Sequence, residues 1–144
     1  MPELIRSVVS RVRIYVKDRR RSPRLRIRLL FSVSIHRNAN GNGSQRRNIL
    51  KGHTRDISFD GLALTVPQVH LDGRHLAAEE RELDLKLELP GGGPMSMLVV
   101  PRRYEKLDEA ELGCNYLLGV QIVQIADEDR TRYLSFINQG LKGQ

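Results

Sequence analysis

Every second residue from position 25 to position 35 is apolar, and this regular alternation restricts the possible folds more than any other feature of the sequence. The apolar positions are Leu25, Ile27, Leu29, Phe31, Val33 and Ile35. A period of two places all six side chains on one face of an extended chain, which predicts a strand with one face in a core. Strands of this kind are typical of antiparallel sheets. We therefore expect a protein that is mainly β.

The same alternation recurs in shorter segments that turn residues separate. It predicts strands at 54–59 and 62–66 on either side of Asp60-Gly61, a hairpin of 83–89 and 95–99 around a PGGGP turn, and a strand at 116–125. A helix is predicted from about residue 128 to 141, with Asp127 as its N-cap. Several short strands and one helix predict a small antiparallel barrel or sandwich that the terminal helix closes at one end.

Positive charge is concentrated near the start of the sequence. The formal net charge is +7, and residues 1–28 contain ten of the 24 Lys and Arg side chains but only two acidic ones. The remainder of the chain is close to neutral. This distribution indicates one local anion-binding feature, whereas a nucleic-acid binder would be expected to carry its charge more widely.

The basic segment ends in DRRRSPRLRIRL, which begins at Asp18. Pro23 disfavours a helix here, so the segment is expected to be extended. Residues of equal parity then share a face, opposite the apolar stripe; these are Arg20, Arg24, Arg26 and Arg28. Guanidinium groups spaced along one face suit a ligand with anionic groups and flat rings, because each group can bond two oxygens or stack on a ring.

The second group of candidate residues is DISFDG at 56–61. Alternation places Asp56, Ser58 and Asp60 opposite Ile57 and Phe59, so these polar groups are predicted to face solvent or a ligand together. A carboxylate and a hydroxyl there can accept from the N–H groups of a ligand. Gly61 allows either a close backbone approach or a positive φ. The same residue types also form ordinary hairpin turns.

The pattern RxxxR at 20–24 followed by DxSxxG at 56–61 resembles the PilZ domain family, and the resemblance extends to the strand LLGVQIVQI and the terminal helix. It implies a six-stranded antiparallel barrel with a C-terminal helix that binds cyclic di-GMP. It also implies that Arg20 and Arg24 contact phosphate and guanine, that Asp56, Ser58 and Gly61 line the other side of a guanine, and that Arg19 and Arg21 assist. On this basis residues 18–142 are a PilZ-like domain, and residues 1–17 are an N-terminal arm or linker.

The expected function is that of a receptor or adaptor whose arm changes conformation on ligand binding and signals to a partner protein. Two alternatives stay open: a PilZ-fold interaction module that binds no nucleotide, and a basic arm that binds nucleic acid or a membrane surface. Neither catalytic residues nor metal ligands are predicted, since the four histidines lack the spacing of a metal site. The single cysteine, the absence of a secretory signal and apolar runs too short to cross a bilayer favour the cytoplasm.

Overall fold

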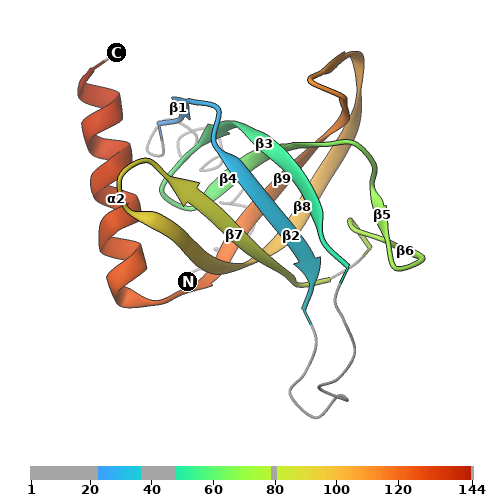
Figure 1. Cartoon of the computed structure of the whole chain (residues 1–144), viewed down its shortest axis with the longest axis horizontal. Coiled ribbons are helices and arrows are strands. Elements are labelled where there is room, and N and C mark those ends of the chain that lie inside the picture. The colour runs from blue at the N-terminus through green and yellow to red at the C-terminus, as the bar shows by residue number, and fades with distance from the viewer. Residues whose placement is uncertain (1–22, 37–47, 79–80, 144) are drawn as a thin grey trace, which may run out of the picture.

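A computed structural model describes residues 23–36, 48–78 and 81–143, and these residues form a closed antiparallel barrel with one helix across one end (Figure 1). The barrel strands are β2 (Leu30–Ile35), β3 (Leu50–Ile57), β4 (Gly61–Val66), β7 (Leu83–Leu89), β8 (Gly93–Glu111) and β9 (Cys114–Ile125). They pair in the order β2–β7–β8–β9–β4–β3, and β3 pairs again with β2. This second pairing closes the ring, so the prediction of a six-stranded barrel with a C-terminal helix is confirmed.

Three shorter strands lie outside the ring. The two-residue strand β1 (Leu25–Arg26) pairs with the far end of β3, ahead of β2. The strands β5 (His70–Leu71) and β6 (Arg74–His75) form a separate small hairpin. Because β1 and β2 both run along β3, the described end of the basic segment, residues 24–28, lies at the end of β3 that leads into the turn before β4.

Alternate residues of the strands fill the barrel. In β7 the four leucines at 83, 85, 87 and 89 are all buried, whereas the residues between them are exposed or half-buried. The strand β4 differs, because all six of its residues are buried. The alternation that predicted the strands therefore describes β7 well, and β4 is covered on both faces.

The single strand predicted from residue 25 to 35 is divided in the structure, and this is a correction to the sequence analysis. The side chain of Thr54, on β3, explains the break. Its hydroxyl donates to the carbonyl of Ile27 (2.6 Å) and accepts from the amide of Leu29 (2.9 Å). These bonds take up the Ile27 carbonyl and the Leu29 amide, while the amide of Thr54 still donates to the carbonyl of Leu29 (2.9 Å), and Thr54 is only 1% exposed. A buried side chain from a neighbouring strand thus separates β1 from β2.

The helix α2 (Asp127–Lys142) packs across one end of the barrel, as Figure 1 shows. Tyr133 and Ile137 are buried in the core, and Arg132 donates to the carbonyls of the turn between β7 and β8, at 2.7 Å for Gly92 and 3.1 Å for Gly93. The predicted cap at Asp127 is wrong. Ala126 occupies the N-cap position, and no side chain caps the helix. The acidic residues of the first turn instead act as favourable charges at the positive end of the helix dipole.

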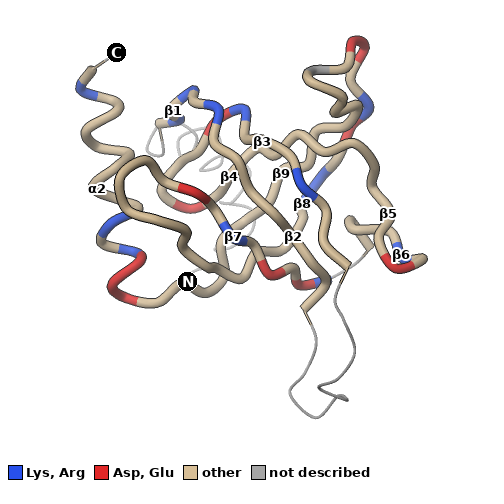
Figure 2. Tube along the Cα trace, viewed as in Figure 1, with Lys and Arg blue, Asp and Glu red and all other residues tan. Residues whose placement is uncertain are grey.

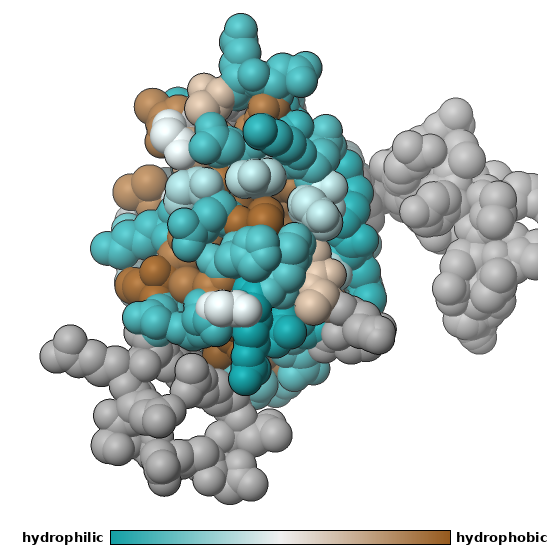
Figure 3. All heavy atoms as spheres, turned by 90° about the vertical axis from the view of Figure 1, so that its right-hand side faces the viewer, coloured by the Kyte–Doolittle hydropathy of each residue, from teal (hydrophilic) through white to brown (hydrophobic). Residues whose placement is uncertain are grey.

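The hairpin of β8 and β9 extends well beyond the barrel (Figure 1). Its strands are longer than the predicted segments 95–99 and 116–125. The prediction was too short because the outer parts of the strands are polar and carry no apolar alternation. Figure 3 shows the side of the molecule with β5, β6 and this hairpin, where hydrophilic residues predominate and hydrophobic areas are small. At the tip, Leu112 is 73% exposed. The extension is therefore a feature of backbone pairing rather than of a buried core.

Candidate functional site

The two sequence motifs meet at an ion pair between Arg24 and Asp56, which the chain separates by 32 positions. The pairing of β1 with β3 explains the contact. Leu25 lies opposite Ile57 and Arg26 opposite Asp56, so Arg24 is carried to the end of β3. Only the Nε atom of Arg24 contacts the carboxylate, and the side chains of Arg24 and Asp56 are 47% and 16% exposed. The pair is therefore open on the arginine side.

The turn between β3 and β4 is held by bonds from Ser58. Its amide donates to the carbonyl of Gly61 (2.8 Å), and its hydroxyl lies 3.2 Å from the same carbonyl and 3.0 Å from Oδ1 of Asp60. The carbonyl of Asp60 accepts from the amide of Ile122 on β9 (2.9 Å). Ser58 is fully buried. The expectation that Ser58 faces outward with Asp56 and Asp60 is therefore wrong: Asp60 is exposed, but Ser58 points into the turn and fixes its shape.

Gly61 is required by a close backbone approach. A Cβ atom built on this residue would lie 2.6 Å from the carbonyl oxygen of Val120 on β9. Its φ angle is not among the positive values found at other glycines of the chain. Of the two reasons that the sequence offered for a glycine here, the structure supports close packing of β4 against β9.

Tyr133, which the sequence analysis did not single out, contacts the turn from the helix α2. Its hydroxyl donates to the carbonyl of Ser58 at 2.7 Å and lies 3.4 Å from that of Gly61. Burial raises the pKa of Tyr133 far above its ordinary value; Asp60 and Asp56 act in the same direction, whereas Arg24 acts against them. Tyr133 stands four residues before Ile137 on the packing stripe of the helix, so helical periodicity was the available signal.

A hollow of about 410 Å³ adjoins the turn. It is lined by Phe59, Asp60, Arg130, Leu134 and Asn138, which come from the turn and from the outer side of α2. The lining offers one carboxylate, one guanidinium group, one amide and two apolar surfaces. A polar ring system in this hollow would lie directly beside the DxSxxG residues.

The structure thus brings together four of the seven predicted site residues, in two different roles. Arg24 and Asp56 present charged groups at the surface, and Ser58 and Gly61 shape the turn behind them. Arg19, Arg20 and Arg21 lie outside the described residues. The sequence missed Tyr133 and the helix side of the hollow because nothing local in the chain relates α2 to the turn.

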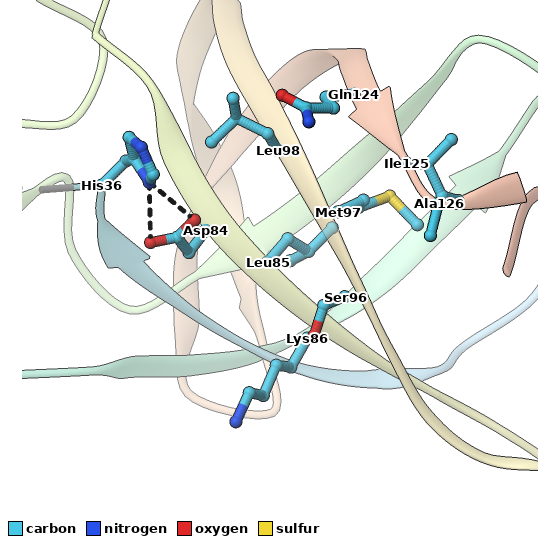
Figure 4. Close-up of a pocket in the computed structure, with 10 residues that line it drawn as sticks. All are labelled: His36, Asp84, Leu85, Lys86, Ser96, Met97, Leu98, Gln124, Ile125 and Ala126. Atoms are coloured by element: carbon cyan, nitrogen blue, oxygen red, sulfur yellow. Dashed lines mark hydrogen bonds and ion pairs between the residues drawn. The ribbon is translucent and has the colours of Figure 1, made fainter. Parts of the chain in front are cut away.

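A second hollow, of about 440 Å³, lies away from both motifs (Figure 4). There Nδ1 of His36 lies 3.0 and 3.2 Å from the two carboxylate oxygens of Asp84. Ser96 and Lys86 lie well apart from this pair in Figure 4, and most of the remaining lining is apolar. Within the described ranges, no three His, Cys, Asp or Glu side chains are grouped to hold a metal ion. No helix among the same residues is long and apolar enough to span a membrane.

Comparison with solved structures relates the fold to known proteins. The Bacillus subtilis inhibitor of motility (MotI/DgrA) matches with a TM-score of 0.61 and 18% identity over 88% of this chain and 52% of its own. The PilZ domain of YcgR from Escherichia coli, solved with c-di-GMP, matches with a TM-score of 0.61 and 10% identity over 87% and 93% of the two chains. MrkH from K. pneumonia, solved as a c-di-GMP complex, matches with a TM-score of 0.58 and 22% identity over 84% and 51%.

This chain thus spans about half the length of MotI/DgrA and MrkH. No curated protein sequence matches it significantly. The family model of the PilZ domain matches residues 18–139, which include both motifs, all barrel strands and most of α2. The chain therefore belongs to the PilZ domain family.

Proposed function

We propose that this chain is a receptor for cyclic di-GMP and that it binds the nucleotide beside the Arg24–Asp56 pair. The observation that carries the proposal is the pair itself, because it joins the two motifs into one surface. Membership of the PilZ domain family supports the ligand, as do two structural neighbours, YcgR and MrkH, that were solved with c-di-GMP.

Arg24 is suited to bind a phosphate or a guanine edge. Its Nε contacts Asp56, and among the described residues no side chain takes up its two terminal nitrogens. Those nitrogens can bond two oxygens of a phosphate, or O6 and N7 of a guanine, in a bidentate arrangement. We propose the same role for Arg20, with Arg19 and Arg21 as additional contacts.

Asp56 is suited to recognise the base. Arg24 contacts its Oδ1, so Oδ2 is placed to accept from the N1 and N2 hydrogens of a guanine. Ser58 and Gly61 contribute indirectly in this proposal. They hold the turn in the shape that places Asp60 and the hollow beside α2 next to Asp56. The base would then stack over the turn with its edge toward the carboxylate.

Binding is proposed to act on a domain at residues 18–142 and on an arm at residues 1–17. The segment 1–28 carries ten basic and only two acidic residues. Its basic groups repel one another until an anion neutralises them. The phosphates of the ligand would supply that charge and draw the arm toward the barrel. A partner protein would then recognise the changed surface.

Calorimetric titration with cyclic di-GMP, compared with GTP, tests the binding. We expect saturable heat for cyclic di-GMP alone, and a loss of affinity of at least about tenfold in Arg24→Ala and in Asp56→Ala. Arg74→Ala is the matched control, since Arg74 is exposed on β6, away from both motifs. Equal heats for the two nucleotides, or an Arg74→Ala variant as weak as Arg24→Ala, would contradict the proposal.

The alternatives are separated by two further measurements. A folded barrel that gives no heat with any nucleotide would be an interaction module. Tight duplex DNA binding that falls steeply with salt and is unchanged in Asp56→Ala would favour the basic arm as a nucleic-acid binder. Hydrogen exchange of residues 1–22 with and without cyclic di-GMP tests the arm, and unchanged exchange would reject the signalling step while leaving the binding step intact.

A further inference from the structure

A third hollow, of about 290 Å³, contains three arginines that belong to neither motif. It is lined by Arg26, Ile27, Arg28, Thr54 and Arg55, at the break between β1 and β2. Figure 2 shows basic residues gathered at this end of the barrel, around β1 and the adjoining ends of β2 and β3. Among the described residues of its lining, three guanidinium groups are the only charged groups.

The local backbone explains why these side chains meet. The register between β3 and β4 shifts between Thr54 and Asp56, so Arg55 is an extra residue in its strand. Such a bulge turns the side chain away from the regular alternation. Thr54, next to Arg55 on β3, bonds the backbone of the neighbouring segment at Ile27 and Leu29, at the break between β1 and β2. The hollow therefore follows from two backbone features, the bulge at Arg55 and the break that Thr54 bridges.

Within the part of the chain that the structure describes, no carboxylate forms an ion pair with the arginines of the hollow. The arginine ion pairs there involve Arg24, Arg103 and Arg132, and Asp56, which lies opposite Arg26, is already paired with Arg24. Arg26 and Arg28 are exposed, and Arg55 is half-buried. Placing three like charges around one hollow is unfavourable unless an anion binds there. The arrangement resembles an anion site more than the usual pattern of alternating surface charges.

We propose that this hollow is a second anion site, specific for a phosphate group and distinct from the site of the two motifs. Guanidinium groups from two neighbouring chain segments can converge on the tetrahedral oxygens of a phosphate, to which each can donate two hydrogen bonds. The phosphate belongs either to a soluble phosphorylated compound or to the headgroup of an anionic lipid. The proposal does not depend on cyclic di-GMP binding.

The test uses inorganic diphosphate as the probe, titrated at constant ionic strength while the arginine Nε–Hε resonances are followed by NMR. We expect saturable shifts of the signals of Arg26, Arg28 and Arg55. Arg28→Gln should weaken binding about fivefold or more. The control is Arg74→Gln, which removes one exposed positive charge elsewhere and should leave the affinity unchanged. Both side chains are exposed, so neither variant is expected to disturb folding.

Sedimentation with vesicles identifies the source of the phosphate. If vesicles of phosphatidic acid in phosphatidylcholine carry down the wild type but not Arg28→Gln, the ligand is a lipid headgroup. If diphosphate binds and the vesicles do not, the ligand is a soluble phosphate compound. The proposal is overturned if the diphosphate shifts do not saturate, or if Arg74→Gln weakens binding as much as Arg28→Gln, since either result indicates diffuse attraction to a basic surface.

Discussion

Replacing Tyr133 with phenylalanine removes one oxygen atom from the support of the DxSxxG turn. The aromatic ring stays, so the apolar area that it buries is unchanged. What is lost is the hydrogen bond of 2.7 Å to the carbonyl of Ser58, at a residue that is 1% exposed. The carbonyl of Ser58 then lacks this donor in a place that solvent reaches poorly. A hydrogen bond of this kind, with a buried acceptor left behind, costs about 1–2 kcal/mol of unfolding free energy.

Urea unfolding followed by circular dichroism measures this loss. We expect a lower midpoint with an unchanged m-value, and a melting temperature lower by about 3–6 °C. Tyr104→Phe is the matched control, because Tyr104 is 50% exposed and its hydroxyl has no hydrogen-bond partner among the described residues. If Tyr133→Phe is as stable as Tyr104→Phe, the hydroxyl does not support the turn and the reasoning fails.

The same hydroxyl predicts a dependence on pH. Because the pKa of Tyr133 is raised in the folded protein, the unfolded chain loses this proton first, near its ordinary pKa of about 10. The folded state then binds more protons than the unfolded state, so stability falls as the pH rises above 10. The stability difference between the wild type and Tyr133→Phe should shrink by about 1 kcal/mol from pH 10 to pH 11. A constant difference would show that the phenol ionises equally in both states.

Two further substitutions test the packing around the site. Gly61→Ala places a methyl group 2.6 Å from the carbonyl oxygen of Val120. We therefore expect thermal unfolding to show a loss of about 2 kcal/mol or more of unfolding free energy. Gly143→Ala, where the added methyl group makes only ordinary contacts, is the control. Thr54→Val keeps the shape of the side chain but removes the two hydrogen bonds of the hydroxyl to the backbone at Ile27 and Leu29. We expect a loss of about 1–3 kcal/mol of unfolding free energy in urea. Thr131→Val, at an exposed position, should cost little, and equal losses in the two variants would contradict the bridging role of Thr54.

Local patterns were sufficient for much of the fold. The leucines of β7 alternate in the sequence and are buried in the structure, because a strand in a barrel has one face inside and one outside. The glycines of the PGGGP turn were assigned to turn geometry, and Gly91 and Gly93 have the positive φ angles that such a turn needs. The order and spacing of the two motifs indicated the family that the matching domain model shows. In each case the information lies within a few residues of the chain.

Alternation also had a limit, because it assigns a residue to a face without showing what covers that face. Ser58 was placed outward with Asp56, yet it is buried, since the turn folds over it and Tyr133 closes it from the helix. The strand predicted from residue 25 is interrupted where the hydroxyl of Thr54 bonds the carbonyl of Ile27 and the amide of Leu29. These contacts join residues 25 to 75 positions apart, so no local pattern reports them.

By itself, the sequence determined whether each main element is a strand or a helix and where the two motifs lie, because these depend on local periodicity and residue type. Only the tertiary structure decided how the segments that carry the two motifs are brought together. Barrel closure through the pairing of β3 with both β2 and β4, together with the pairing of β1 with the end of β3, places Arg24 against Asp56 and leaves Arg26, Arg28 and Arg55 around one hollow. The physical reason is that strand register and closure depend on interactions between segments distant in the chain, and the same register determines which charges are paired and which stay available to a ligand.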